Sequence, residues 1–143
     1  MKYKARLTVM EKSNIRTAAI NWMNTYYPEV ENAIMTSKFY TPEESWSNSR
    51  VWFFQIPLQE IDTKKNRFIN LVCQNHLKGD DFLNIKVPSS FFIINEKSFE
   101  VDYKEKVIRL YLSAEAVDMF KEVRKGSKLD FKKYIQNPPK SIL

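Results

Sequence analysis

The sequence predicts one α+β domain with a mostly antiparallel sheet of five or six strands, on which an N-terminal helix and a C-terminal helix pack. Segments rich in Val, Ile, Phe and Trp follow one another from residue 50 onward, separated by short polar turns. These turns are too short to hold the crossover helices that parallel strands need. No repeat, linker or low-complexity tract divides the chain. We therefore expect a single domain over residues 1–137 and a short tail over residues 138–143, which begins at two prolines.

The N-terminal region combines a strand pattern with a helix pattern. Polar and apolar residues alternate over residues 2–9, which predicts a half-buried strand with Lys2, Lys4 and Arg6 on one face. Ser13 is expected to cap a helix that runs to Tyr26, because apolar residues then recur with the 3.6-residue period of a helix. A cationic strand face of this kind must be exposed or covered by a ligand, since burial of unpaired charge is costly.

Two short helical segments and three strands are expected in the middle of the chain. Residues 29–36 are interpreted as a short helix, with a strand as the alternative. Residues 41–44 (Thr-Pro-Glu-Glu) predict one helical turn, because a capping threonine, a proline and two carboxylates suit a helix N-terminus. The β-rich segments predict strands over residues 50–58, 67–74 and 82–87.

A short helix, a hairpin and a longer helix are predicted to follow. Residues 88–94 favour a short helix over a fourth strand. Residues 99–103 and 107–112 predict a hairpin in which each strand has one apolar face. Ser113 is expected to cap a C-terminal helix that runs to Lys125 and directs Val117, Phe120 and Val123 inward. Asp130 is expected to cap a last helical turn.

Composition excludes several classes of protein. The chain has 43% hydrophobic residues, which is typical of a folded protein rather than a disordered one. Its two glycines, Gly79 and Gly126, are too few and too far apart for a phosphate-binding glycine loop. Cys73 is the one cysteine and His76 the one histidine, so a four-ligand zinc site within the chain is excluded. We predict no cofactor and no metal, and no membrane partner. A cytoplasmic location is expected, because a single cysteine suits a reducing compartment.

Positive charge is concentrated near the C-terminus. The formal net charge is +6, and residues 121–140 contain seven basic and two acidic residues. On the expected helix Lys121, Arg124, Lys125 and Lys128 would share one face, which Lys132 and Lys133 would extend. Several cations on one face suit phosphate binding, because each contact releases a counterion. Alternatively, these basic residues form the solvated side of an amphipathic helix, because the C-terminus of a helix favours cations in any case.

Aromatic residues suggest a second kind of contact. Six of them occur between residues 39 and 54, with Arg50 among them. Most should be core, but Trp46 lies in a polar segment and is a candidate contact residue. Exposed aromatic rings can stack on unpaired bases, which stabilises binding by about 1–3 kcal/mol per base.

The sequence therefore predicts a non-catalytic domain that binds nucleic acid, either DNA or RNA, or another polyanion through the basic C-terminal helix face. One alternative is a protein-interaction or regulatory domain, including a homodimer or an inhibitor. The second alternative is a small metal-dependent nuclease built from Asp80, Asp81, Glu100 and Asp102. No motif is specific enough to decide among them.

Overall fold

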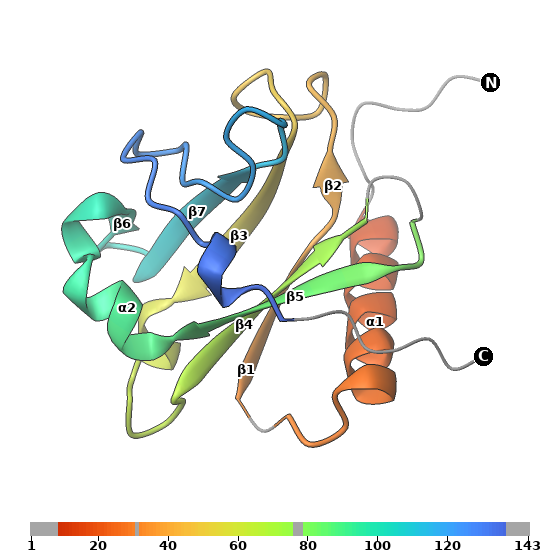
Figure 1. Ribbon diagram of the computed structural model, residues 1–143, viewed down its shortest axis with the longest axis horizontal. Helices are drawn as coiled ribbons and strands as arrows, with labels where there is room; N and C mark the ends of the chain where they lie inside the picture. Colours follow the sequence, from red (N-terminus) through yellow and green to blue (C-terminus); the bar gives the residue numbers. More distant parts are fainter. Residues whose placement is uncertain (1–8, 31, 76–78, 137–143) are drawn as a thin grey trace.

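Two β-sheets enclose the main core, and a long helix covers the outer face of the smaller sheet (Figure 1). The computed structural model describes residues 9–30, 32–75 and 79–136. The helix is α1, Val9–Tyr26. The smaller sheet has the strand order β1-β4-β5, with β1 Ala33–Ser37, β4 Phe68–Gln74 and β5 Phe82–Pro88. The larger sheet has the order β2-β3-β7-β6, with β2 Phe39–Tyr40, β3 Val51–Pro57, β7 Val107–Ser113 and β6 Glu100–Asp102.

One continuous stretch of chain joins the two sheets. Strand β1 pairs with β4 in parallel, and after Lys38 the chain continues as β2, which pairs with β3 in the antiparallel sense. The amide of Phe53 donates a hydrogen bond of 2.8 Å to the Ser37 hydroxyl at the junction. All the other strand pairs are antiparallel. The two sheets are therefore tied together at one edge.

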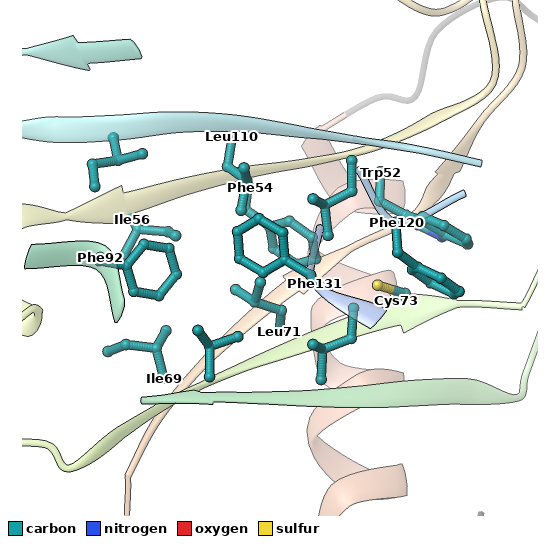
Figure 2. Packing of buried hydrophobic residues seen from close by; sticks show 14 of the residues in the cluster. Trp52, Phe54, Ile56, Ile69, Leu71, Cys73, Phe92, Leu110, Phe120 and Phe131 are labelled. Atoms are coloured by element: carbon teal, nitrogen blue, oxygen red, sulfur yellow. The ribbon is translucent and has the colours of Figure 1, made fainter. Parts of the chain in front are cut away.

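The main core fills the space between the sheets. Trp52, Phe54 and Ile56 alternate along β3 and point toward Ile69 and Leu71 of β4 (Figure 2). Phe120 stacks on Trp52 at 5.2 Å between ring centroids, with the two rings almost parallel. Apolar burial of this extent is the dominant stabilising contribution to such a fold.

A second core lies between α1 and the smaller sheet. Ala19 and Met23 of α1 pack against Val72 and Phe82, and all four side chains are buried. Both faces of the smaller sheet are thus covered, which explains why β4 is an almost continuous hydrophobic run rather than an alternating one.

The structure is α+β, as the sequence predicts, and several elements are confirmed. The three central strands appear as β3, β4 and β5, and the hairpin appears as β6 and β7. Residues 88–94 include the short helix α2, Ser89–Ile94. The amide of Lys132 donates a hydrogen bond of 2.8 Å to the Asp130 carboxylate, at the start of a single 3₁₀ turn, Lys132–Tyr134. Two further 3₁₀ turns are Leu58–Glu60 and Glu96–Ser98.

The predicted single sheet of five or six strands is wrong, because in the part of the chain that the structure describes seven strands form two sheets. The short helix predicted over residues 29–36 is also wrong, since residues 33–37 form β1. Its partner β4 lies more than thirty positions away, so local propensity could not reveal the pairing.

The boundary of the first helix and the turn at residues 41–44 also differ from expectation. Helix α1 begins at Val9, so Ser13 lies inside it and residue 9 is helical rather than extended. Residues 2–8 of the predicted strand fall outside the described residues. Residues 41–44 form a hydrogen-bonded turn rather than a helical turn, in which the Glu44 amide bonds the Thr41 carbonyl at 3.0 Å.

The predicted C-terminal helix over residues 113–125 is wrong. Ser113 is the last residue of β7, and the chain then turns back so that Glu122 forms a bridge with Leu112. Phe120 has a φ of 68°, which no helix accommodates, and this conformation allows its ring to stack on Trp52. Val117, which was expected in the core, is 89% exposed.

Glu122 organises the segment that replaces the helix. Its side chain is fully buried, and its carboxylate accepts hydrogen bonds from the Lys125 amide and from the amide and hydroxyl of Ser127, the latter two at 2.9 and 2.8 Å. Gly126, with a φ of 88°, makes the turn between these two donors. A buried carboxylate with several N–H and O–H donors fixes the loop without a cation.

We expect Glu122→Gln to lower the free energy of unfolding by about 1–3 kcal/mol, because an amide group then faces donors that need an acceptor. Urea denaturation followed by circular dichroism measures the change. Glu105→Gln, at an exposed position in the β6–β7 turn, is the matched control and should leave stability unchanged. Equal stability of the Glu122→Gln variant and the wild type would contradict this account of the loop.

Candidate nucleic-acid interface

The structure brings two of the predicted contact residues together. Trp46 is 60% exposed, and the Arg124 guanidinium lies 4.0 Å from the centre of its ring. Arg124 also donates two hydrogen bonds to the Glu100 carboxylate, at 2.7 and 3.1 Å. These bonds hold the pKa of Glu100 below its ordinary value. The charge of Arg124 is therefore matched by a carboxylate of the same chain.

The other basic residues near the C-terminus do not form the expected helix face. Lys128 has its ammonium group 2.6 Å from the Asp118 carboxylate. Lys133 lies against the rings of Phe91 and Tyr134. Lys125 and Lys132 are exposed, and Lys121 is half-buried beside its bridge to Asp130. Arg50 is exposed and its amide bonds the Glu115 carboxylate. Lys2, Lys4 and Arg6 lie outside the described residues.

The carboxylates of the nuclease hypothesis contact groups other than one another. Asp81 accepts a hydrogen bond of 3.0 Å from the Trp22 indole, and Asp102 forms an ion pair of 2.7 Å with Arg109. Asp80 is exposed, and Glu100 binds Arg124. Within residues 9–30, 32–75 and 79–136, no three His, Cys, Asp or Glu side chains gather as they would to hold a metal ion.

Cys73, the one cysteine, is buried in β4. Burial raises the pKa of its thiol well above the ordinary value, so the thiolate is disfavoured. His76, the one histidine, lies outside the described residues.

A pocket of about 690 Å³ lies at the end of α1, and it was not anticipated from the sequence. The end of α1, the start of β1 and the loop that leads into β4 lie along the lower part of the view in Figure 1, and hydrogen bonds join the loop to the start of β1. We call this the basic pocket. Its lining residues are Tyr26, Tyr27, Pro28, Glu29, Val30, Asn32, Lys64, Lys65, Arg67, Phe68 and Lys86.

The loop that carries three of the basic side chains is held rigidly. The Asp62 carboxylate accepts a hydrogen bond of 2.8 Å from the Lys64 amide, and the Asp62 carbonyl accepts one of 2.7 Å from the Asn66 amide. Asn66 is buried, and its side chain accepts a bond from the Ala33 amide and donates to Glu60. This network positions the loop before any ligand arrives, which lowers the entropy cost of binding.

The same loop is anchored at its other end. The Asn32 side chain accepts a hydrogen bond of 3.1 Å from the Arg67 amide. The Arg67 carbonyl accepts a bond of 2.9 Å from the Ser89 amide, and the buried Ser89 hydroxyl donates to the Asn66 carbonyl at 2.6 Å. The residue before β1 and the start of helix α2 therefore both fix the backbone of Arg67.

Two cations of the basic pocket converge on one aromatic ring. The Lys86 ammonium lies 4.4 Å from the centre of the Phe68 ring, and the Arg67 guanidinium carbon lies 5.6 Å from it. Lys65 forms an ion pair of 2.9 Å with Glu60. No described carboxylate forms an ion pair with Lys64, Arg67 or Lys86, and Glu29 is the one acid among the lining residues. The pocket therefore carries an excess of positive charge.

Aromatic rings from the end of α1 and from the turn after it form one wall of the basic pocket. Tyr26 is 36% exposed, and Tyr27 is half-buried. Trp22 contacts both, with ring centroids 5.4 Å from Tyr26 and 5.6 Å from Tyr27. The indole of Trp22 is in turn fixed by its bond to Asp81. The wall is thus supported from behind by packed side chains.

Polar side chains continue from the basic pocket beneath α1. Asn70 and Asn84 lie on the face of the sheet that carries Phe68 and Lys86, and both are buried. Asn84 donates a hydrogen bond of 3.2 Å to Asn70, and Asn70 donates one of 3.2 Å to the Ala33 carbonyl. This pair links β5 and β4 to β1 and helps to fix the strand positions around Lys86.

A smaller pocket of about 320 Å³ lies on the other side of β1, and its charge is more nearly balanced. It contains two cations, Arg16 and Lys38. Lys38 forms an ion pair of 2.6 Å with Glu44, and Arg16 contacts the Ile34 carbonyl at 3.5 Å. We therefore regard the basic pocket as the better candidate for an anionic ligand.

The comparisons with known proteins assign no family. No protein-family model matches the sequence, and neither a curated protein nor a solved structure is similar enough to the chain to count as a match. Among the helices of the described residues, none has the length and apolar character needed to cross a bilayer.

The run Lys64-Lys65-Asn66-Arg67 was the one sequence signal for the basic pocket. Residues 64–66 belong to a short polar turn and Arg67 to the strand predicted over residues 67–74, so this run does not by itself indicate a site. Lys86 lies on a different strand and Tyr26 on a helix, so the sequence offered nothing to associate them with this turn. The pairing of β4 with β1 and β5 brings the three together.

We expect Asn66→Ala to lower the free energy of unfolding by about 1–3 kcal/mol, since it removes the acceptor of the Ala33 amide and the two bonds to Glu60. Urea denaturation measures this change in the free energy of unfolding. Asn24→Ala, on the exposed side of α1, is the matched control and should be neutral or slightly stabilising. A neutral Asn66→Ala variant would show that the loop does not depend on this side chain.

A pH dependence is expected from the Glu100–Arg124 pair. Because the folded state lowers the pKa of Glu100, the pair stabilises the fold at neutral pH, and this contribution is lost as the pH falls through the folded-state pKa. The wild type should therefore be more stable than Glu100→Gln at pH 7, and the difference should shrink below about pH 4. Unfolding free energies measured from pH 7 to pH 3 test this, and a constant difference would contradict it.

Proposed function

We propose that this domain binds nucleic acid without catalysing a reaction, and that phosphate groups bind in the basic pocket at the end of α1. The observation that carries the proposal is the convergence of Arg67 and Lys86 on the Phe68 ring. Two cations near one ring repel each other, and an anion between them removes that repulsion. The proposal keeps the function expected from the sequence and moves its centre away from the C-terminal segment.

The local charge balance supports a phosphate ligand. In the C-terminal segment, Arg124 and Lys128 pair with carboxylates of the same chain, so binding a phosphate there requires competition with Glu100 and Asp118. In the basic pocket Lys64, Arg67 and Lys86 form no ion pair with a described carboxylate. Arginine is suited to bidentate phosphate contacts, and lysine adds a mobile point charge.

Nucleic acid fits this pocket better than other polyanions do. The pocket wall consists of Tyr26 and Tyr27 with Trp22 behind them, and aromatic rings of this kind bind nucleobases by stacking. A sulfated sugar or a polyphosphate would use the cations and not the aromatic wall. The net charge of +6 further favours encounter with a polyanion.

We expect wild-type protein to bind a fluorescein-labelled 20-nucleotide single strand in 20 mM salt, with affinity that falls steeply as salt rises to 200 mM. Lys64→Ala, Arg67→Ala and Lys86→Ala should each weaken binding and lower the slope of log K against log salt by about 0.7–0.9, because each removes one phosphate contact. Fluorescence anisotropy at five salt concentrations measures both quantities.

Lys97→Ala and Lys104→Ala remove the same charge at exposed positions outside the pocket and serve as matched controls. They should change the affinity little. Absence of binding by the wild type in 20 mM salt, or an equal loss in pocket and control variants, would refute the proposal. Lys125→Ala and Lys132→Ala test the C-terminal segment, and a larger loss there would move the interface to that segment.

One observation favours the second candidate, a protein-interaction domain. Trp46 is 60% exposed, yet one side of its ring is fixed by Arg124 and its edge by Tyr111, at 5.6 Å between centroids. Tryptophan and arginine are enriched among residues that dominate protein interfaces. Trp46→Ala should leave nucleic-acid affinity unchanged if the basic pocket is the nucleic-acid site, so the same anisotropy measurements separate the two surfaces.

A further inference from the structure

We infer that the basic pocket holds an unpaired nucleotide of a single strand, with its base against the Tyr26 and Tyr27 wall and its phosphate near Arg67 and Lys86. The domain then prefers single-stranded nucleic acid to a duplex. This inference rests on the proposed function and makes it more specific, because it names the form of nucleic acid that the site recognises.

The shape of the site favours an unpaired nucleotide. The pocket is open to solvent and has a volume of about 690 Å³, which is large enough for one nucleotide. In a duplex the flat faces of the bases are stacked on one another and only their edges line the grooves. A base can therefore contact a pocket wall with its face only after it has left the stack or when it has no partner strand.

The aromatic wall is prepared for such a base. Tyr26 is 36% exposed although Trp22 contacts its ring at 5.4 Å, so one part of the ring is supported and another part remains accessible. Trp22 itself packs on Phe82 at 6.1 Å and is bonded to Asp81. A ring held in this way loses little conformational freedom when a base stacks on it.

The cations and the aromatic rings of the basic pocket come from different elements. Tyr26 and Tyr27 belong to the end of α1 and the following turn, whereas Lys64 and Arg67 belong to the loop before β4 and Lys86 belongs to β5. A pocket that combines aromatic rings with cations matches the polarity of a nucleotide, which has an aromatic base at one end and an anionic phosphate at the other. A phosphate-only ligand would use the cations alone.

The test compares three labelled probes by fluorescence anisotropy with the full chain in 20 mM salt: a 12-nucleotide oligothymidylate, its duplex with oligoadenylate, and an abasic 12-mer with the same number of phosphates. We expect the oligothymidylate to bind at least about tenfold more tightly than the other two, since stacking of even one base can supply such a factor. Unlabelled thymidine 5′-monophosphate, added as a competitor, tests whether a free nucleotide is bound instead.

Tyr26→Ala should weaken binding of the oligothymidylate by about tenfold and leave binding of the abasic 12-mer unchanged. Tyr26→Phe keeps the ring and should bind like the wild type. Tyr103→Ala, at a 65% exposed tyrosine outside the pocket, is the matched control and should have no effect. Because Tyr26 is exposed, the variant should fold, and thermal unfolding followed by circular dichroism verifies this for each protein.

Equal affinity for the three probes, or an equal loss of affinity for all of them in Tyr26→Ala, would refute the inference while the proposed function stands. The inference would also be refuted if thymidine 5′-monophosphate displaced the oligothymidylate when both are present at the same total concentration of nucleotide. The ligand would then be a free nucleotide. If no probe binds, or if Arg67→Ala and Lys86→Ala bind every probe like the wild type, the proposed function itself fails.

Discussion

The parallel pairing of β1 with β4 is the contact on which the rest of the structure depends. It places the end of α1 beside the loop before β4, and it leads the chain through Lys38 into the second sheet. Asn32 and Asn66 extend the pairing beyond the strands, because each bonds the backbone of the opposite segment. Without this contact the aromatic wall and the basic loop would belong to unconnected parts of the molecule. The fold and the basic pocket therefore have a common origin.

Neighbouring carboxylates give the positive charges of this protein different roles. Arg124 and Lys128 contribute to the fold near the C-terminus, where each is bound by a carboxylate from another element or turn. The buried Glu122 shapes the same region through backbone donors rather than through a cation. In contrast, Arg67 and Lys86 are held beside an aromatic ring. An excess of lysine and arginine in a stretch of sequence is thus a poor guide to where the surface is free to bind an anion.

Local patterns predicted the elements whose structure is determined by neighbouring residues. Richness in Val, Ile, Phe and Trp located β3, β4 and β5, and one apolar face on each strand located the β6–β7 hairpin. The same reasoning failed at residues 113–125, where Phe120 adopts a positive φ to stack on Trp52. It also failed at residues 33–37, where pairing with β4 outweighs the local preference for a helix. In both places a contact distant in sequence supplies more free energy than propensity does.

By itself the sequence determined the α+β class, the central strands and the excess of positive charge. It also marked Trp46 as an exposed aromatic residue, because that residue lies in a polar segment. The tertiary structure alone decided that the described strands form two sheets, that residues 113–125 form no helix, and that Tyr26, Arg67 and Lys86 share one pocket. The physical reason is that periodicity reports which face of an element is buried, whereas the partner of that face is chosen by packing between segments far apart in the chain.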